Sequence, residues 1–137
     1  MPVDGSENAL RAVRQVLDKR AWYREALELH LVNVQLPVAS GAVRMFIPQD
    51  QLREYYDDEG HKALRAAKDL LQASGVPFHC RVGVGDPAPT IVHYCTEHGC
   101  DLIAMGTRGL GALGNVLIGS VATKVIHLAQ VPVLLVK

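Results

Sequence analysis

The sequence lacks an excess of charge of either sign, a long apolar run and a recognisable export signal. Its 137 residues carry 14 basic and 14 acidic side chains, so the formal net charge is zero. A balanced charge gives no electrostatic attraction for nucleic acid. No apolar stretch approaches the roughly 18–20 residues that span a bilayer, and the first residues have neither a basic nor an apolar signal segment. We therefore expect no nucleic-acid partner, no membrane association and no signal peptide.

Cysteine is also scarce, with three residues in the chain. An odd and small number of cysteines cannot form a closed set of disulfides, and reduced thiols are typical of the cytoplasm. A cytoplasmic location is therefore predicted. The length and the hydrophobic content of 49% fit one globular domain with its own core, so residues 1–137 are expected to form a single domain.

Short apolar runs alternate with amphipathic stretches, a pattern typical of βαβ units around a parallel sheet. Ser6 is a natural N-cap for the first helix, and Gly60 is expected to bend or fray the second. Right-handed crossovers place such helices on both faces of the sheet. The predicted fold class is α/β, a single open twisted parallel sheet of five strands. The strands are predicted at residues 1–4, 26–34, 78–84, 102–105 and 133–136, and the helices at 6–20, 49–74, 88–99 and 120–130.

The predicted loop over residues 35–48 is unusually apolar, since it contains Val43, Met45, Phe46 and Ile47. Two interpretations stay open for these side chains. They pack on the edge of the sheet, or they form a lid or a contact with a partner.

The strongest local signal is a glycine-rich segment between the fourth predicted strand and the last helix. Gly106, Gly109 and Gly119 precede Ser120 with the spacing G-x2-G-x9-G-S. Glycine lets the backbone approach a ligand closely, ligands bind at the carboxyl ends of parallel strands, and free amides at a helix N-terminus favour an anion. We predict a phosphate cradle in which Gly119 admits the phosphate while Ser120 and the Val121 amide donate to it.

Arg108 and Asn115 are placed to add contacts to this phosphate. The alternative is a flexible loop in which Ser120 is an ordinary N-cap. A Walker A motif is excluded because no lysine precedes Ser120. Residues 109–114 match G-x-G-x-x-G, but no acidic residue follows them, so we interpret this dinucleotide-type match as accidental.

Other polar residues give weaker signals. Asp4 ends the first predicted strand, where it either accepts from ribose hydroxyls or serves as an exposed turn acid near the helix dipole. The segment 93–100 contains two histidines and two cysteines, but helical spacing keeps these side chains from converging on a metal. His30, His79 and His127 are interpreted as structural histidines. No metal site and no catalytic set is predicted.

Several segments together resemble the universal stress protein family. They are residues 3–6 (VDGS), 29–32 (LHLV), 101–106 (DLIAMG), the G-x2-G-x9-G-S spacing and 131–136 (VPVLLV). The resemblance covers nearly the whole chain. It implies an adenine-nucleotide-binding fold with strand order 3-2-1-4-5 and homodimers that pair through their last strands.

The resemblance also implies a ligand, ATP, with Mg²⁺ or Mn²⁺ bridging its phosphates. Asp4 then meets the ribose, Pro2 lines the pocket and the Leu31 backbone reads the adenine edge. Met105 and Gly106 flank the nucleoside. The phosphates are held by Gly109, Gly119, Ser120 and Val121. One departure is that only Met1 precedes Pro2, where the family has several apolar residues, so a less stable first strand and a looser ribose contact are expected.

Three functions follow from these observations. The first is a cytoplasmic ATP-binding stress-response protein that acts as a sensor or regulator, with at most slow ATP hydrolysis because no catalytic base is evident. The second is a dimeric interaction module in which the pocket is incidental. The third is an adenylyl-transferring enzyme, for which the sequence shows neither a clear nucleophile nor a substrate pocket.

Overall fold

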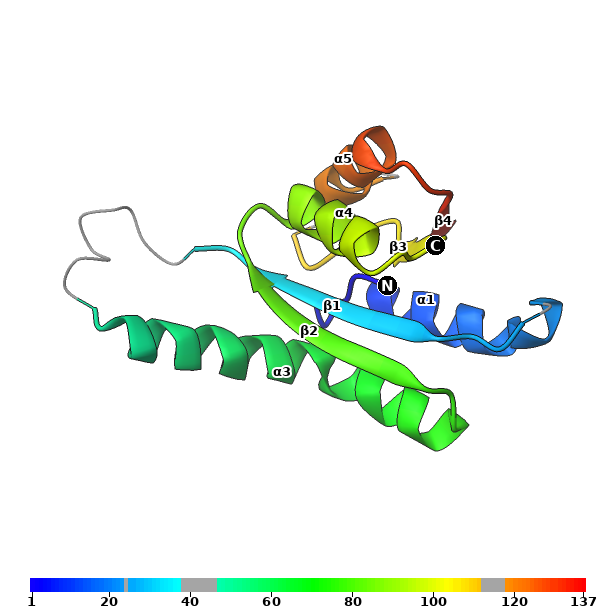
Figure 1. Ribbon diagram of the computed structural model, residues 1–137, viewed down its shortest axis with the longest axis horizontal. Helices are drawn as coiled ribbons and strands as arrows, with labels where there is room; N and C mark the ends of the chain where they lie inside the picture. Colours follow the sequence, from blue (N-terminus) through cyan, green and yellow to red (C-terminus); the bar gives the residue numbers. More distant parts are fainter. Residues whose placement is uncertain (24, 38–46, 112–117) are drawn as a thin grey trace.

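The computed structural model describes residues 1–23, 25–37, 47–111 and 118–137 (Figure 1). All four predicted helices and the last four predicted strands are present. The short helix η1 was not predicted, and β1 begins at Leu29 rather than at residue 26. Of the apolar loop, Val43, Met45 and Phe46 lie outside the described residues.

The elements are α1 (Glu7–Asp18), η1 (Arg20–Trp22), β1 (Leu29–Gln35), α3 (Gln49–Ser74), β2 (Phe78–Val84), α4 (Pro87–Glu97), β3 (Ile103–Gly106), α5 (Ser120–Leu128) and β4 (Val133–Val136).

The strands form two parallel pairs, β1 with β2 and β3 with β4. The N-terminal segment joins β1 through a single bridge between Pro2 and Val32. In it, the Val3 amide donates to the Val32 carbonyl at 2.9 Å and the Val32 amide donates to the Met1 carbonyl at 3.0 Å. Proline has no N–H to extend a ladder, and the chain turns into α1 directly afterwards. The first predicted strand therefore contributes a bridge, and no ladder joins it to β3 within the described ranges.

Helices cover both faces of the strands, as predicted. Figure 1 shows α3 on one side of β1 and β2 and α4 on the other. The alternation of side chains along β3 divides the core in the same way, because Ala104 packs in a cluster with α1 and α3 whereas Ile103 and Met105 pack with α4 and α5. The result is a layer of strands between two layers of helices.

The long helix α3 runs unbroken through Gly60. Gly60 is buried against β2, where an added Cβ would lie 2.4 Å from Cγ1 of Val82. The expectation of a frayed helix at this position is wrong, because the missing side chain allows the helix to pack closely on the strand.

No helix in the part of the chain that the structure describes is long and apolar enough to cross a lipid bilayer. The three cysteines, Cys80, Cys95 and Cys100, are free thiols.

Candidate functional site

The glycine-rich loop leaves β3 and returns to the start of α5. Its two ends are fixed to each other and to the strands, because the Thr107 amide donates to the Val136 carbonyl at 2.8 Å and the Gly119 amide donates to the Thr107 carbonyl at 2.7 Å. The loop therefore opens at the carboxyl ends of β3 and β4, where open α/β sheets bind ligands.

The carboxylate of Asp4 holds this loop. Its Oδ2 accepts a hydrogen bond from the Leu110 amide at 2.9 Å, and its Oδ1 accepts one from the Ser6 amide at 3.0 Å. A Cβ atom added to Gly109 would lie 2.3 Å from the same Oδ2, which is closer than van der Waals contact allows. A side chain at position 109 would therefore displace this carboxylate oxygen, so Gly109 allows the observed contact between the loop and Asp4.

The N-terminus of α5 follows the loop and has no side-chain cap among the residues that the structure describes. Gly119 occupies the N-cap position and Ser120 is the first helical residue, so the alternative in which Ser120 is the N-cap is wrong. The Thr123 amide and hydroxyl both donate to the Gly119 carbonyl at 3.0 Å. The amides of Ser120 and Val121 meet no acceptor among the described residues, which leaves them available to an anion.

Two buried polar atoms of the loop have no hydrogen-bond partner within the described ranges, the Thr107 hydroxyl and Nε of Arg108. Buried polar groups are almost always paired, so these atoms favour a polar ligand at this position. Arg108 was predicted to contribute. Thr107 was not predicted as a site residue because it lies at a variable position of the G-x2-G-x9-G-S spacing. A hydroxyl directly after a buried strand is nevertheless a sequence feature that could have indicated it.

Three other residues predicted for the nucleotide site, Leu31, Met105 and Gly106, also take part in packing of the core. Met105 is buried with residues of α4 and α5, and an added Cβ at Gly106 would lie 2.8 Å from the Asn8 carbonyl oxygen of α1. The side chain of Leu31 is buried in the cluster of α1 and α3. Asn115 lies outside the described residues.

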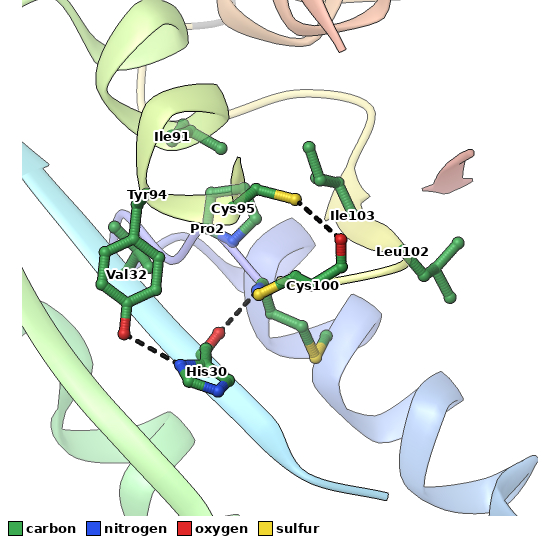
Figure 2. Close-up of a pocket in the computed structure, with 10 residues that line it drawn as sticks. Pro2, His30, Val32, Ile91, Tyr94, Cys95, Cys100, Leu102 and Ile103 are labelled. Atoms are coloured by element: carbon green, nitrogen blue, oxygen red, sulfur yellow. Dashed lines mark hydrogen bonds between the residues drawn. The ribbon is translucent and has the colours of Figure 1, made fainter. Parts of the chain in front are cut away.

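Pro2 lines a different pocket, between α4 and β1 (Figure 2). There the Tyr94 hydroxyl lies 2.9 Å from Nδ1 of His30, and the Cys95 thiol donates to the Cys100 carbonyl at 3.4 Å. Burial raises the pKa of Tyr94, and burial together with the nearby His79 lowers the pKa of His30. Apart from Pro2, no predicted site residue lines this pocket.

The two histidines of segment 93–100 have separate partners. His93 pairs with Glu97 at 3.3 Å, and Nδ1 of His98 bonds to the Tyr94 carbonyl at 2.9 Å. Each of these contacts is local to α4 and its end, as the helical spacing predicts.

Comparisons with known proteins agree along the whole chain. The family model described as "Universal stress protein family" matches residues 1–137. Universal stress protein MJ0531 of Methanocaldococcus jannaschii is 33% identical over 138 residues, which cover 100% of this chain and 79% of that protein. The solved structure of MJ0577, from the same organism, superposes with a TM-score of 0.84 at 30% identity and covers 99% of this chain and 92% of its own.

A third similar protein, a universal stress protein solved in complex with cAMP, superposes with a TM-score of 0.67 at 26% identity, over 98% of this chain and 91% of its own. The match of the family model to every residue, together with these similarities, leads to one conclusion. The chain belongs to the universal stress protein family.

Proposed function

We propose that this protein binds an adenine nucleotide, ATP, at the glycine-rich loop and acts as a nucleotide-dependent sensor or regulator in a stress response. The observation that carries the proposal is the convergence of three features at one edge of β3. They are the loop held by Asp4, the N-terminus of α5, which has no side-chain cap among the described residues, and the polar atoms of Thr107 and Arg108, which have no hydrogen-bond partner among them. Together they form a cradle that suits a phosphate chain.

Each part of the nucleotide has a candidate partner. The amides of Ser120 and Val121 would hold the phosphates, with Gly109 and Gly119 keeping the cradle open. Each carboxylate oxygen of Asp4 accepts one hydrogen bond and keeps capacity for a ribose hydroxyl.

The remaining predicted residues would bind the nucleoside part of the ligand. Pro2, the Leu31 backbone, Met105 and Gly106 would surround the nucleoside. This requires the strands to act as one sheet in the order 3-2-1-4-5. The similar protein solved with cAMP supports an adenine nucleotide as the ligand class.

A divalent ion, Mg²⁺ or Mn²⁺, would neutralise the charge of the phosphates when they are bound. Among the described residues around the loop we identify no group placed as a general base, so hydrolysis of ATP would be slow at most. A regulatory role in the cytoplasm fits this combination of binding and weak chemistry.

Thermal unfolding with millimolar MgATP tests the proposal. A ligand at 100 times its dissociation constant adds about 2.7 kcal/mol to the free energy of unfolding, which raises Tm by at least several degrees in a chain of this length. Gly119→Val should abolish the shift by filling the cradle. Gly111→Ala is the control, because an added Cβ at Gly111 would meet no atom of the described residues within 4 Å. An unmoved transition in the wild-type protein would overturn the proposal.

A specific observation also favours pairing of two copies through β4. Within the described residues β4 pairs with β3 alone, and apolar side chains are exposed on α5 and β4, with Ile126 at 43%, Leu128 at 47% and Leu134 at 40%. An apolar edge strand favours a covering partner. Sedimentation should detect a dimer that Leu134→Lys dissociates and that Leu36→Lys, a control at the end of β1, leaves intact. A wild-type monomer would contradict this pairing.

A further inference from the structure

Outside the nucleotide site, two histidines and one glutamate face one another across β1 and β2. The two strands run parallel in a register that pairs His30 with His79. Glu28 lies two positions before His30, and residues two apart in extended chain share one face. Side chains from positions 28, 30 and 79 therefore meet at the start of both strands, which lie side by side in Figure 1.

The ligand atoms of this cluster are close enough to share one ion. Oε1 of Glu28 lies 2.9 Å from Nε2 of His79 and 3.8 Å from Nε2 of His30, and one ligand atom from each residue lies within 4.8 Å of the others. Zinc–ligand bonds of about 2.0–2.2 Å in a tetrahedron separate neighbouring ligand atoms by about 3.4 Å. The two measured distances to the glutamate lie on either side of that value, so small side-chain shifts suffice.

We propose that Glu28, His30 and His79 bind a divalent transition-metal ion, with zinc the favoured ion. Two imidazoles and one carboxylate are a ligand set typical of zinc with three protein ligands, where water takes the fourth position. Glu28 and His79 are 64% and 60% exposed, so the ion can enter from solvent and keep that water. The site involves none of the residues assigned to the nucleotide.

His30 is oriented for this role by a residue of α4. Figure 2 shows the Tyr94 hydroxyl reaching His30 from the helix, and its distance to Nδ1 is 2.9 Å. With Nδ1 engaged in this way, Nε2 is the nitrogen that faces Glu28. Hydrogen bonds to the second ring nitrogen commonly fix the orientation of a metal-binding histidine.

The burial of His30 also suits a fixed ligand. Its side chain is 15% exposed, so packing limits its movement beside Glu28. A simple ion pair with Glu28 would need only one imidazole. Here the imidazoles of His30 and His79 both lie near the same oxygen of Glu28. The bound ion would take the place of the direct contact between Glu28 and His79.

Titration calorimetry of the nucleotide-free protein with ZnCl₂ tests the site. We expect one ion per chain, and at least tenfold weaker binding in His79→Ala and in Glu28→Gln. His93→Ala is the matched control, since His93 also pairs with a glutamate and is 73% exposed, and it should bind like the wild-type protein. Because His79 and Glu28 are exposed, both variants should fold, which circular dichroism checks.

Cobalt replaces zinc in a second measurement that identifies the ligands. A Co²⁺ complex with nitrogen and oxygen ligands lacks the intense near-ultraviolet band of a cobalt–thiolate bond, and its absence is the expected result. The proposal is overturned if the thiolate band appears, if the wild-type protein takes up no zinc, or if His79→Ala binds as tightly as the wild-type protein. Since no nucleotide is present, failure here leaves the nucleotide proposal unaffected.

Discussion

The carboxylate of Asp4 and the amide of Leu110 are joined by a 2.9 Å hydrogen bond across 106 positions of sequence. The other carboxylate oxygen accepts from the Ser6 amide at the start of α1. One side chain thus connects the N-terminal segment, the first helix and the glycine-rich loop. The geometry of the candidate phosphate cradle therefore depends on a residue far from it in sequence.

Replacement of Asp4 should weaken both the fold and the loop. Asp4→Ala leaves the Ser6 and Leu110 amides without their acceptor. Because hydrogen bonds to a charged group contribute about 1.5–3 kcal/mol when well formed and these are partly exposed, we expect a loss of about 1–2 kcal/mol in urea unfolding. Asp4→Asn retains one acceptor oxygen and should lose less. Asp69→Ala, an exposed acid on α3, is the control, and equal stability of Asp4→Ala and wild type would contradict the account.

Gly106 should not tolerate a side chain. An added Cβ would lie 2.8 Å from the Asn8 carbonyl oxygen and 2.9 Å from its carbon, both backbone atoms of α1 that cannot rotate away. Overpacking of this kind costs about 1–3 kcal/mol, so Gly106→Ala should lower the free energy of unfolding by that amount. Gly111→Ala, within the same loop, should change it little. If the two variants were equally stable, the close packing of β3 on α1 would be disproved.

Gly60 offers a test of helix propensity against packing. Alanine in the interior of a helix is favoured over glycine by about 1 kcal/mol, but here its Cβ would lie 2.4 Å from Cγ1 of Val82, a side chain with few rotamers. We expect Gly60→Ala to destabilise the wild-type protein and to stabilise the Val82→Ala variant. A double-mutant cycle measures this coupling, and a coupling of zero would refute it.

Cys95 should titrate above its ordinary range. Burial, and then the neighbouring Cys100, raise the pKa of Cys95 above its ordinary value. A pKa raised in the folded state stabilises the fold below the unfolded pKa and loses that contribution as the pH rises through the folded value. The rate of Cys95 alkylation by iodoacetamide, followed by peptide mass spectrometry, should therefore have its pH midpoint higher in the folded protein than in the urea-unfolded protein. An equal or lower midpoint in the folded protein would contradict this.

Much of the fold follows from local patterns. The cap at Ser6, whose hydroxyl accepts from the Ala9 amide at 3.2 Å, and the stop at Gly75, which has a left-handed φ of 69°, were predictable because they depend on neighbouring residues. The weak pairing of the N-terminal segment was less predictable. It depends on Pro2 and on the early turn into α1, which compete with the apolar character that favours a strand.

The candidate sites also differ in how far the sequence predicts them. The phosphate cradle could be predicted because its glycines and its helix start lie within one segment of the sequence. The contact between Asp4 and Leu110 could not, because it depends on how distant elements pack. The cluster of Glu28, His30 and His79 depends on the register between two strands, and no periodicity of one strand determines its register with another.

Titration calorimetry with MgATP on the wild-type protein and the two loop variants tests the central claim most directly. The account predicts saturable binding of one nucleotide per chain to the wild-type protein and to Gly111→Ala, and no measurable binding to a folded Gly119→Val. Absence of heat with the wild-type protein, or equal affinity of Gly119→Val, would contradict the assignment of the nucleotide to this loop.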